Sequence, residues 1–377
     1  MPLFGSALPD FPWDSLVPDR KRAAEHPGGS LDLTIGTPVD DVPELAQRAL
    51  AEASNAHGYP TVLGTPALQQ AIRGWLSRRR SVTSNIGAIP TVGSKEMVAL
   101  LPAFLGLGEG QRVGFPLAAY PTYDVGARLA GAQPVPIDTD ADPESWPVVD
   151  LMWINSPGNP NGHVHSRDDL RKIVAWARAN GVTIASDECY GELPWDVAEA
   201  PSILADDVCD SDPTRLLVLY SLSKQSNLAG YRAAFIAGDP AILADLLEVR
   251  KHSGFMVPGP IQHAMAVMLD DDDHVATQRE VYRARRNKLL SVLDAAGLVN
   301  DPDSVAGLYL WVEDKGGADA WAITHACAEL GIVVAPGTFY GDAGANRVRI
   351  SLTAKDETID AAVLRLTELP EALKAFR

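Results

Sequence analysis

The feature that most constrains the fold is an alternation between short apolar runs and helical patterns, which extends over residues 66–250. The apolar runs are rich in Val, Ile and Leu without strict alternation, as is typical of strands covered on both faces. Alternation of such strands with helices predicts an α/β fold with a mostly parallel sheet. The expected strands are residues 88–92, 111–115, 133–137, 149–154, 181–186, 216–220 and 233–237.

Helical patterns fill several gaps between these strands. The stretch 94–105 places apolar residues along one face, which is typical of a helix packed on a core. Residues 166–169 (SRDD) resemble a capping box, and they predict a helix that stops at Gly181. Another helix begins near Pro66, and we expect the three arginines at 78–80 to form its exposed end.

The last hundred residues have a different pattern, which predicts a smaller α+β domain. Its expected elements are helices at 281–296 and 318–330, strands at 308–312, 332–335 and 347–352, and a closing helix. We therefore expect a large domain at 41–275, a small domain at 276–377, and an N-terminal segment, 1–40, that packs with the small domain.

Charge and composition exclude several classes of protein. The formal net charge is −17, and binding to nucleic acid needs a basic face. No apolar stretch is long enough to cross a membrane, and the N-terminus lacks the order of a signal peptide, so we expect a cytoplasmic protein. Three scattered cysteines, Cys189, Cys209 and Cys327, indicate neither a disulfide framework nor a zinc site.

Other conspicuous segments carry no site in this interpretation. The glycine-rich stretch 106–110 follows a helix rather than a strand, so a dinucleotide-binding loop is not expected. The acidic run 270–273 is typical of a solvated helix end. His163 and His165 have no third ligand nearby in sequence, so we expect a surface loop and no metal.

Polar residues follow three of the expected strands, at the ends where ligands bind in parallel sheets. They are Asn155, Asp187 and the segment 221–224 (SLSK). A lysine amine such as that of Lys224 forms a Schiff base with an aldehyde when it is deprotonated and held in place, and burial and nearby positive charge lower the pKa of a lysine. Arg232, Ser221 and Ser223 would supply a phosphate with charge and hydroxyl groups. The short motif alone leaves open a surface lysine in a serine-rich loop.

Taken together, these segments resemble the fold-type-I pyridoxal-phosphate (PLP) enzymes, in particular the class I/II aminotransferases. The family's segments occur in its order and at its usual spacings, and the resemblance spans residues 36–349. One departure is Ser156, an extra residue in the asparagine–proline loop. The matching segments are SLSK at 221–224 with GYR at 230–232, NSPGNPNG at 155–162, and SDECY at 186–190.

The resemblance implies PLP as cofactor, carried by Lys224 as a Schiff base. Asp187 would pair with the pyridinium nitrogen and keep the ring protonated, so that the ring accepts the electrons released when Cα–H breaks. Asn159 and Tyr190 would donate to the phenolic oxygen of PLP. Considered singly, Asp187 is equally a loop acid and Tyr190 an ordinary packed tyrosine.

The resemblance also implies how the rest of the cofactor is held. Segment 91–96 resembles the family's phosphate-binding turn, with the backbone N–H groups of a helix N-terminus facing the phosphate. Tyr120 matches the aromatic residue that stacks on the pyridine ring, and Tyr59 matches the tyrosine that reaches the phosphate in the neighbouring subunit, which implies a homodimer. The phosphate-binding residues would be Gly93, Ser94, Lys95, Ser221, Ser223 and Arg232.

For the substrate, Arg349 matches the arginine that binds the α-carboxylate, a role suited to a planar guanidinium. Arg347 would lie on the same face of the strand, and we prefer Arg349 because the family arginine precedes a short apolar–serine pair. Gly36 matches the segment that closes over the substrate, and Asn159 would contact the substrate as well as the cofactor.

The implied reaction is a ping-pong transamination through pyridoxamine phosphate, with Lys224 as base and acid in turn. Segment 11–16 (FPWDSL) and the chain as a whole resemble actinobacterial N-succinyldiaminopimelate aminotransferases, which implies glutamate as donor and a role in lysine biosynthesis. Three alternatives remain. The chain could be an aminotransferase for another amino acid, such as aspartate or an aromatic amino acid, a PLP-dependent C–S β-lyase, or a non-enzymatic PLP-binding regulator.

Overall fold

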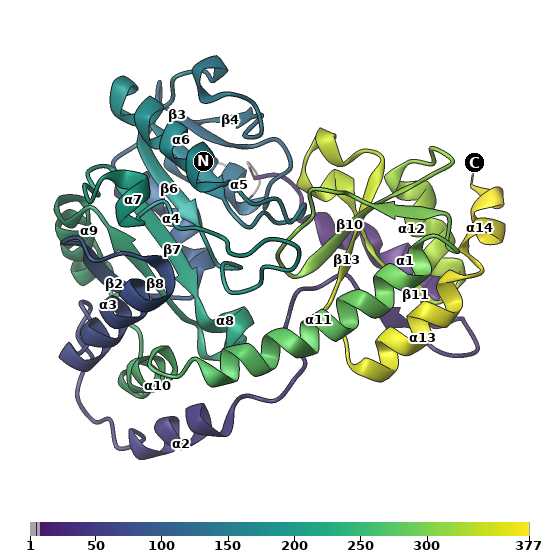
Figure 1. The fold of residues 1–377 in the computed structure, drawn as a ribbon, viewed down its shortest axis with the longest axis horizontal. Coiled ribbons are helices and arrows are strands. Elements are labelled where there is room, and N and C mark those ends of the chain that lie inside the picture. The colour runs from purple at the N-terminus through teal and green to yellow at the C-terminus, as the bar shows by residue number, and fades with distance from the viewer. Residues whose placement is uncertain (1–4, 6–7, 377) are drawn as a thin grey trace.

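The computed structural model describes residue 5 and residues 8–376, so residues 1–4, 6–7 and 377, including part of the predicted N-terminal segment, lie outside it. Two parts lie side by side in Figure 1. We call the elements around a seven-stranded sheet (residues 44–269) the large part. The elements around a four-stranded sheet (residues 8–33 and 298–376) are the small part.

The seven-stranded sheet has the order β2-β8-β7-β6-β5-β3-β4, and only β8 runs antiparallel to its neighbours. The predicted fold class, a mostly parallel α/β sheet, is thereby confirmed. Each expected strand is present within two residues of its predicted bounds. The strands are β2 (Gly87–Val92), β3 (Arg112–Pro116), β4 (Gln133–Ile137), β5 (Leu151–Asn155), β6 (Thr183–Asp187), β7 (Leu216–Ser221) and β8 (Ala233–Gly238).

Successive residues of the central strands face opposite sides of the sheet, and each side is covered by helices. In β5, Leu151 and Trp153 belong to one hydrophobic cluster, whereas Met152 and Ile154 belong to the other. The first cluster includes α4 (Ser94–Phe104), α5 (Thr122–Ala130) and α9 (Pro240–Ser253). The second includes α2 (Glu44–Glu52), α3 (Pro66–Arg80), α6 (Arg167–Asn180), α7 (Asp206–Cys209) and α10 (Gly259–Leu269).

Helix α6 has the predicted boundaries, because both of its caps form. The Ser166 side chain accepts a hydrogen bond from the Asp169 backbone N–H at 3.2 Å, and the Asp169 carboxylate accepts one from the Ser166 N–H at 3.1 Å. Gly181 ends the helix with a φ of 66°, a left-handed conformation that glycine adopts without steric cost.

The small part contains an antiparallel sheet of order β12-β13-β10-β9 and a separate parallel pair, β1 with β11. The single strand predicted at 332–335 is therefore wrong, because Val334 separates two short strands that belong to different sheets. The strands are β1 (Leu31–Asp32), β9 (Leu298–Asn300), β10 (Tyr309–Asp314), β11 (Ile332–Val333), β12 (Ala335–Pro336) and β13 (Arg347–Ser351).

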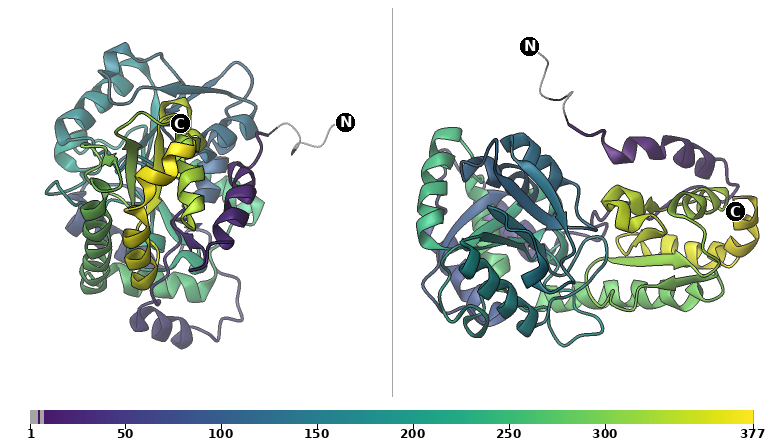
Figure 2. Two further views of the ribbon diagram at one scale, coloured as in Figure 1. Left: turned by 90° about the vertical axis from the view of Figure 1, so that its right-hand side faces the viewer. Right: turned by 90° about the horizontal axis from the view of Figure 1, so that it is seen from above.

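Helices cover this smaller sheet, and residues 17–32 of the N-terminal segment lie against it, as both views of Figure 2 show. The helices are α1 (Val17–Ala24), α12 (Ala320–Glu329), α13 (Asp356–Leu366) and α14 (Leu369–Ala372). Short 3-10 turns complete the chain at Pro12–Leu16, Pro143–Ser145, Ala229–Tyr231, Gly337–Tyr340, Asp342–Gly344 and Leu373–Ala375.

A long helix, α11 (Asp273–Leu293), runs from the large part to the small part (Figure 1). The sequence predicted its start near residue 281, which is wrong by about two turns. Its first turns are polar, but their side chains are paired: Gln278 bonds Asn227 and Asp40, each at 2.8 Å. Hydrogen bonding rather than an apolar stripe anchors this end, so hydrophobic periodicity did not reveal it.

Two residues predicted at the surface are buried. The Arg80 side chain lies between Trp75 and Tyr220, with its guanidinium 5.0 Å and 5.3 Å from the two ring centroids, and pairs with Glu192. His165 is also buried, because its loop folds back so that the His165 N–H donates to Ser156 Oγ at 3.0 Å. Tertiary contacts override the local polar pattern at both positions.

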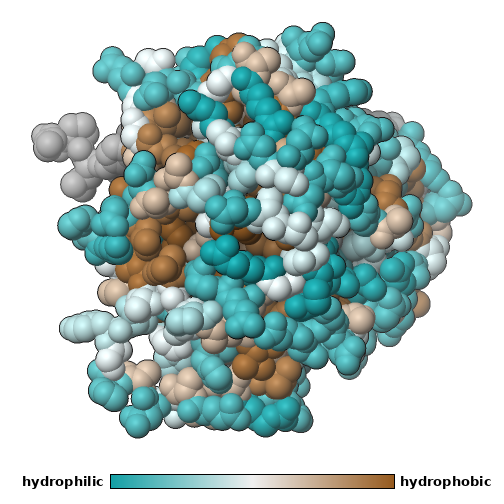
Figure 3. Space-filling model, turned by 60° about the vertical axis from the view of Figure 1, so that its left-hand side comes forward, coloured by the Kyte–Doolittle hydropathy of each residue, from teal (hydrophilic) through white to brown (hydrophobic). Residues whose placement is uncertain are grey.

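Within the part of the chain that the structure describes, no helix is both long and apolar enough to span a bilayer. The surface drawn in Figure 3 is mostly hydrophilic, with hydrophobic patches between polar side chains.

Candidate active site

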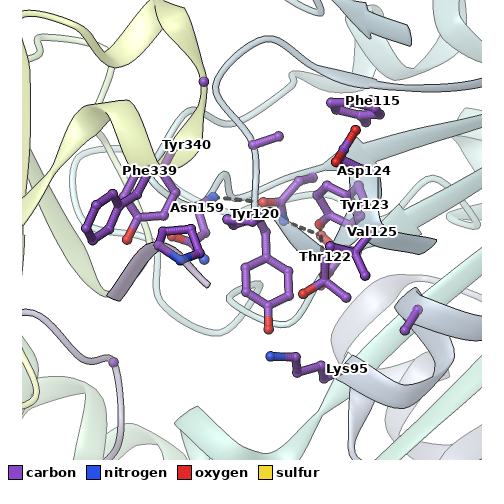
Figure 4. A pocket seen from close by; sticks show the side chains of 18 of the residues that line it. Lys95, Phe115, Tyr120, Thr122, Tyr123, Asp124, Val125, Asn159, Phe339 and Tyr340 are labelled. Atoms are coloured by element: carbon purple, nitrogen blue, oxygen red, sulfur yellow. Dashed lines mark hydrogen bonds between the residues drawn. The ribbon is translucent and has the colours of Figure 1, made fainter. Parts of the chain in front are cut away.

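A cavity of about 1540 Å³ opens at the carboxyl ends of β5, β6 and β7, where residues of the large and small parts meet. Figure 4 shows Tyr120 in this cavity, with Lys95 on one side and Phe339 and Tyr340 on the other. Twelve of the predicted site residues line it: Gly36, Ser94, Lys95, Tyr120, Asn159, Asp187, Tyr190, Ser221, Ser223, Lys224, Arg232 and Arg349.

Strand register brings the first polar residues together. Asn155 and Asp187 are direct partners at the ends of the parallel strands β5 and β6. The Asn155 side chain donates to the Asp187 carbonyl at 2.9 Å and accepts from the Asn159 N–H at 2.8 Å. Asn155 therefore shapes the loop that carries Asn159 into the cavity.

Asp187 is a buried carboxylate without a cationic partner among the described residues. Its two oxygens accept hydrogen bonds from the Tyr123 hydroxyl at 3.0 Å and the Cys189 N–H at 3.2 Å. Burial raises the pKa of Asp187, because loss of water disfavours its charged form. A protonated ring nitrogen placed beside it would compensate this cost, so Asp187 fits the cofactor that the resemblance implies.

Lys224 lies in the short helix α8 (Leu222–Gln225), directly after β7. Its ammonium group donates to the carbonyl of Gly36, which belongs to the N-terminal segment. Burial lowers the pKa of Lys224, and the positive charges of Arg349 and Arg232 act in the same direction. A lysine with a lowered pKa is more often neutral, and the neutral amine is the form that attacks an aldehyde.

Hydroxyl groups and a guanidinium surround a second region of the cavity. Ser221 caps α8 and donates to Ser223 Oγ at 2.8 Å. Arg232 donates to the Ala229 carbonyl at 2.8 Å and forms no ion pair with the described residues. Ser94 begins α4, whose N-terminus favours anions. This donor set fits a phosphate.

Gly93 lies next to this region rather than in the cavity lining. Its φ is 72°, and a Cβ atom at this position would overlap the Arg232 guanidinium. Its N–H donates to the Arg232 carbonyl at 2.7 Å. Gly93 therefore allows the close approach of Arg232. This role differs from the predicted one, which was direct contact with the phosphate.

Arg349 enters the cavity from β13 and is 3% exposed. It donates to Asn159 Oδ1 at 2.7 Å and to the Thr34 carbonyl, while its Nε atom has no hydrogen-bond partner among the described residues. Arg347, the alternative in the sequence, pairs with Asp301 and Glu313 at 3.3 Å and 3.2 Å. Arg347 is absent from the cavity lining.

The outer wall of the cavity is aromatic. Trp13 lies 5.3 Å from Phe339 and 5.4 Å from Phe11, measured between ring centroids. Phe11 is 58% exposed. Two arginines, Arg20 and Arg128, reach the same cavity, and each is paired with an aspartate. These residues were not predicted as site residues, because they lie far apart in the sequence and only folding brings them to one cavity.

Tyr59 lies outside the cavity of its own chain and is 95% exposed, which is unusual for a tyrosine. Its predicted contact with a neighbouring cofactor stays a prediction.

Three further residues of the inner site were missed. Tyr123 bonds Asp187 and stacks on Trp153 at 5.1 Å, and only its spacing from Tyr120 gave a signal. Cys189 lines the cavity, and it lies in the SDECY segment, in which roles were predicted only for Asp187 and Tyr190. Tyr309 lies in a run (GLYLWV) that is indistinguishable from an ordinary buried strand.

One group of described residues has the spacing of metal ligands: His163, Asp301 and Asp303. The loop was expected to lack a third ligand, but chain folding brings Asp301 to 3.4 Å from His163 Nε2. Asp140 lies 3.0 Å from His163 Nδ1, and these aspartates raise the pKa of His163 to about 9 against the opposing effect of burial. His163, Asp140 and Asp301 therefore form an ion-pair network in which the histidine is protonated.

Comparison with known proteins agrees with this geometry. Residues 29–366 match the family model described as aminotransferase class I and II. The chain is 50% identical to 4-dedimethylamino-4-oxo-anhydrotetracycline transaminase OxyQ of Streptomyces rimosus, over 96% of this chain and 99% of that protein. It is 51% identical to the probable aminotransferase Rv1178 of Mycobacterium tuberculosis, over 96% of this chain and 86% of the relative.

Solved structures with the same fold include N-succinyldiaminopimelate aminotransferase from Mycobacterium tuberculosis. That structure superimposes with a TM-score of 0.86 at 26% identity, over 98% of this chain and all of the other. A substrate-bound BacF structure from Bacillus subtilis has a TM-score of 0.87 at 27% identity, over 98% of this chain and 97% of that one. The chain therefore belongs to the class I and II aminotransferases, which in this fold depend on PLP.

Proposed function

We propose that this aminotransferase exchanges an amino group between glutamate and a long keto acid, with Lys224 as the residue that carries PLP and moves the proton. The observation that carries the proposal is the meeting, in one cavity, of three groups: a lysine with a lowered pKa, a buried carboxylate, and an arginine. Within the described residues the carboxylate has no cationic partner, and the arginine Nε atom has no hydrogen-bond partner. These groups match an amine carrier, a ring-nitrogen partner and a carboxylate site, respectively.

The proposed roles follow from charge and position. PLP supplies an electron sink for the pair of electrons left when the substrate Cα–H bond breaks. Asp187 holds the ring nitrogen, and Arg349 holds the substrate carboxylate through its planar guanidinium. Lys224 Nζ takes the Cα proton and returns it on the cofactor side, because its neutral form accepts a proton and its charged form donates one.

The proposed keto-acid substrate derives from N-succinyl-LL-2,6-diaminopimelate, with 2-oxoglutarate and glutamate as the other pair. The cavity of about 1540 Å³ has to hold the cofactor and the substrate together, and it exceeds the usual range for one small molecule, about 300–1,000 Å³, so it has room for a substrate longer than glutamate. Arg20 and Arg128 place positive charge near the outer cavity, as a second carboxylate requires. A structural neighbour bears this substrate in its name.

A second candidate is a bulky apolar ketone. Phe11, Trp13 and Phe339 give the outer wall an apolar character, and both outer arginines are already paired with aspartates. A relative with 50% identity is named for a 4-oxo-anhydrotetracycline substrate. A PLP-dependent C–S β-lyase, which uses the same inner groups, is the third candidate and differs in releasing ammonia without an amino acceptor.

We also propose that the enzyme is a cytoplasmic homodimer whose Tyr59 reaches the partner's cofactor. The support is that Tyr59 is almost fully exposed in one chain and that hydrophobic patches interrupt the hydrophilic surface (Figure 3). Sedimentation velocity tests the assembly, and a monomer with full activity would contradict it.

The visible absorption of the purified holoenzyme tests the reaction class. Glutamate should remove the absorption band of the bound cofactor, and a keto acid should restore it. A panel of keto acids then separates the candidates: selective restoration by the succinylated amino-keto-pimelate supports the first, and by a bulky cyclic ketone the second. Ammonia released from a sulfur-containing amino acid without any keto acid would instead identify a lyase.

A further inference from the structure

Tyr309 is a buried tyrosine at the centre of the cavity whose position no sequence motif marks. It begins β10, the strand that pairs with β13, which carries Arg349. In this pair Tyr309 lies opposite Ser351, and Trp311 lies opposite Arg349. It is 4% exposed and lines the cavity together with Lys224 and Arg349. Its side chain contacts Arg349 through the ring and Tyr190 through the hydroxyl.

The ring of Tyr309 supports Arg349. The guanidinium carbon of Arg349 lies 3.8 Å from the Tyr309 ring centroid, and the Tyr340 ring lies on it at 4.8 Å. Cation–π contacts are strongest where water is excluded, as at this buried pair. Together with the bonds from Arg349 to Asn159 and Thr34, the rings leave the guanidinium little freedom.

The hydroxyl of Tyr309 lies beside the groups proposed to act on the cofactor. It is 3.2 Å from the Tyr190 hydroxyl. A Cβ atom at Gly36 would overlap it, so the glycine makes room for this hydroxyl next to the carbonyl that accepts from Lys224. The ring of Tyr309 contacts Arg349, and its hydroxyl interacts with Tyr190 and with the same guanidinium, so the ring and the hydroxyl are tested by different substitutions.

The two tyrosine hydroxyls have different electrostatic surroundings. Burial raises the pKa of Tyr309, but the positive charges of Arg349 and Lys224 outweigh it and lower the pKa overall. Burial and then the neighbouring Tyr309 raise the pKa of Tyr190. Either hydroxyl can donate in this bond, but if Tyr190 gives its proton to the phenolic oxygen of the cofactor, Tyr309 is the donor to Tyr190. The titratable groups that face it are Lys224 (α8), Tyr190 (after β6), Arg349 (β13), Tyr282 (α11) and Tyr340.

We propose that Tyr309 is a positioning residue with two separable functions: its ring orients Arg349 toward the substrate carboxylate, and its hydroxyl donates to Tyr190, which frees the Tyr190 proton for the phenolic oxygen of the cofactor. The proposal rests on the proposed function of Tyr190 and Arg349. A hydroxyl that accepts a hydrogen bond becomes a stronger donor, so removing the Tyr309 hydroxyl weakens the contact from Tyr190 to the cofactor.

The hydroxyl is tested by the Tyr309→Phe variant of the holoenzyme, measured without substrate. The readout is the pH midpoint of the visible band of bound PLP, which reports the proton on the nitrogen that links Lys224 to the cofactor. A weaker donor at the phenolic oxygen stabilises the deprotonated form less, so the midpoint should rise by about 0.5–1 pH unit. The KM for glutamate should stay within about twofold, because the ring remains.

Tyr340→Phe is the matched control. Tyr340 is also buried and also packs on Arg349, but its hydroxyl has no hydrogen-bond partner among the described residues. Its midpoint should equal that of the wild type. An unchanged midpoint in Tyr309→Phe, or an equal shift in both variants, overturns the function of the hydroxyl.

The ring is tested by Tyr309→Leu and Tyr309→Met. Loss of the cation–π contact should raise the KM for glutamate about tenfold while kcat falls less than threefold. Wild-type KM in either variant that retains the visible band overturns the function of the ring. Failure of the proposed function looks different: the wild-type band is then absent, or it does not respond to glutamate.

Discussion

The two parts of the molecule supply different halves of the site, in different ways. The large part contributes Asp187 from the last residue of the parallel strand β6 and Lys224 from the short helix α8 that directly follows β7, so strand register fixes their positions. The small part contributes Arg349 and Tyr309 from within an antiparallel sheet, where side-chain stacking fixes them. We infer that residues of the large part bind the cofactor and carry out its chemistry. Residues of the small part and of the aromatic outer wall determine which substrate binds.

The largest expected effect comes from the large part. Asp187→Asn keeps the shape of the side chain but removes the charge that holds the ring nitrogen, so kcat should fall about 10²–10³-fold. The rates of the two half-reactions, followed by stopped-flow absorbance, check this.

Glu188→Gln is its control, because Glu188 is the next residue, is also buried, and bonds Ser186 and the Ile203 N–H outside the cavity. Its kcat should stay within about fivefold of the wild type. Equal losses in the two variants would mean that burial of a carboxylate in this loop, rather than contact with the cofactor, is what matters.

The next effect belongs to the small part. Arg349→Lys retains a positive charge but loses the planar pair of donors, so the KM for glutamate should rise about 10–100-fold while the visible band stays unchanged. Arg347→Lys, on the same strand but outside the cavity, should leave KM within about twofold. A lost visible band in Arg349→Lys would contradict the division between the two parts.

A smaller effect is expected at the outer wall. Trp13→Ala removes the centre of the aromatic group, so kcat/KM for the long substrate should fall about tenfold while the half-reaction with glutamate is unaffected. Steady-state kinetics with both substrates check the prediction. An equal loss for glutamate would show that the N-terminal segment supports the inner site rather than substrate selection.

The smallest effect concerns a link between the parts. His163 of the large part pairs with Asp301 of the small part and with Asp140. Its pKa is raised from 6.5 to about 9, so the pair stabilises the fold fully below pH 6.5 and the stabilisation is lost as the pH rises through 9. Allowing for solvent screening, we expect about 1 kcal/mol.

Denaturant unfolding of His163→Gln at pH 6 and pH 9.5 measures this contribution. The variant should be less stable than the wild type only at pH 6, and its activity at pH 6 should persist. The exposed His252→Gln variant should show no such difference. If the difference in unfolding free energy between the wild type and His163→Gln is the same at pH 6 and at pH 9.5, the proposed stabilisation by this ion pair is wrong.

The sequence predicted the large part better than the small part for a physical reason. Buried parallel strands appear as uninterrupted apolar runs, and the polar residues that follow them, such as Asn155 and Asp187, form short recognisable segments. Features made by long-range contacts left no such trace: the start of α11, the burial of Arg80 and His165, and the splitting of residues 332–335 between two sheets.

Tyr309 illustrates the same limit within the site. Its sequence neighbours are apolar and strand-like, and its hydroxyl acquires meaning only when folding brings Tyr190 and Gly36 beside it. Trp13 is similar, since its partner Phe339 lies more than three hundred residues away. For Tyr59 the relevant contact lies in a second chain, so its function remains a prediction.

The most direct test of the account is to locate the covalent bond to the cofactor. Borohydride reduction of the holoenzyme, followed by peptide mass spectrometry, should place one pyridoxyl phosphate group on Lys224, and the Lys224→Ala variant should lose both the label and the visible band. A label on another lysine in the wild-type protein, or turnover by Lys224→Ala at the normal rate, would contradict the assignment of Lys224.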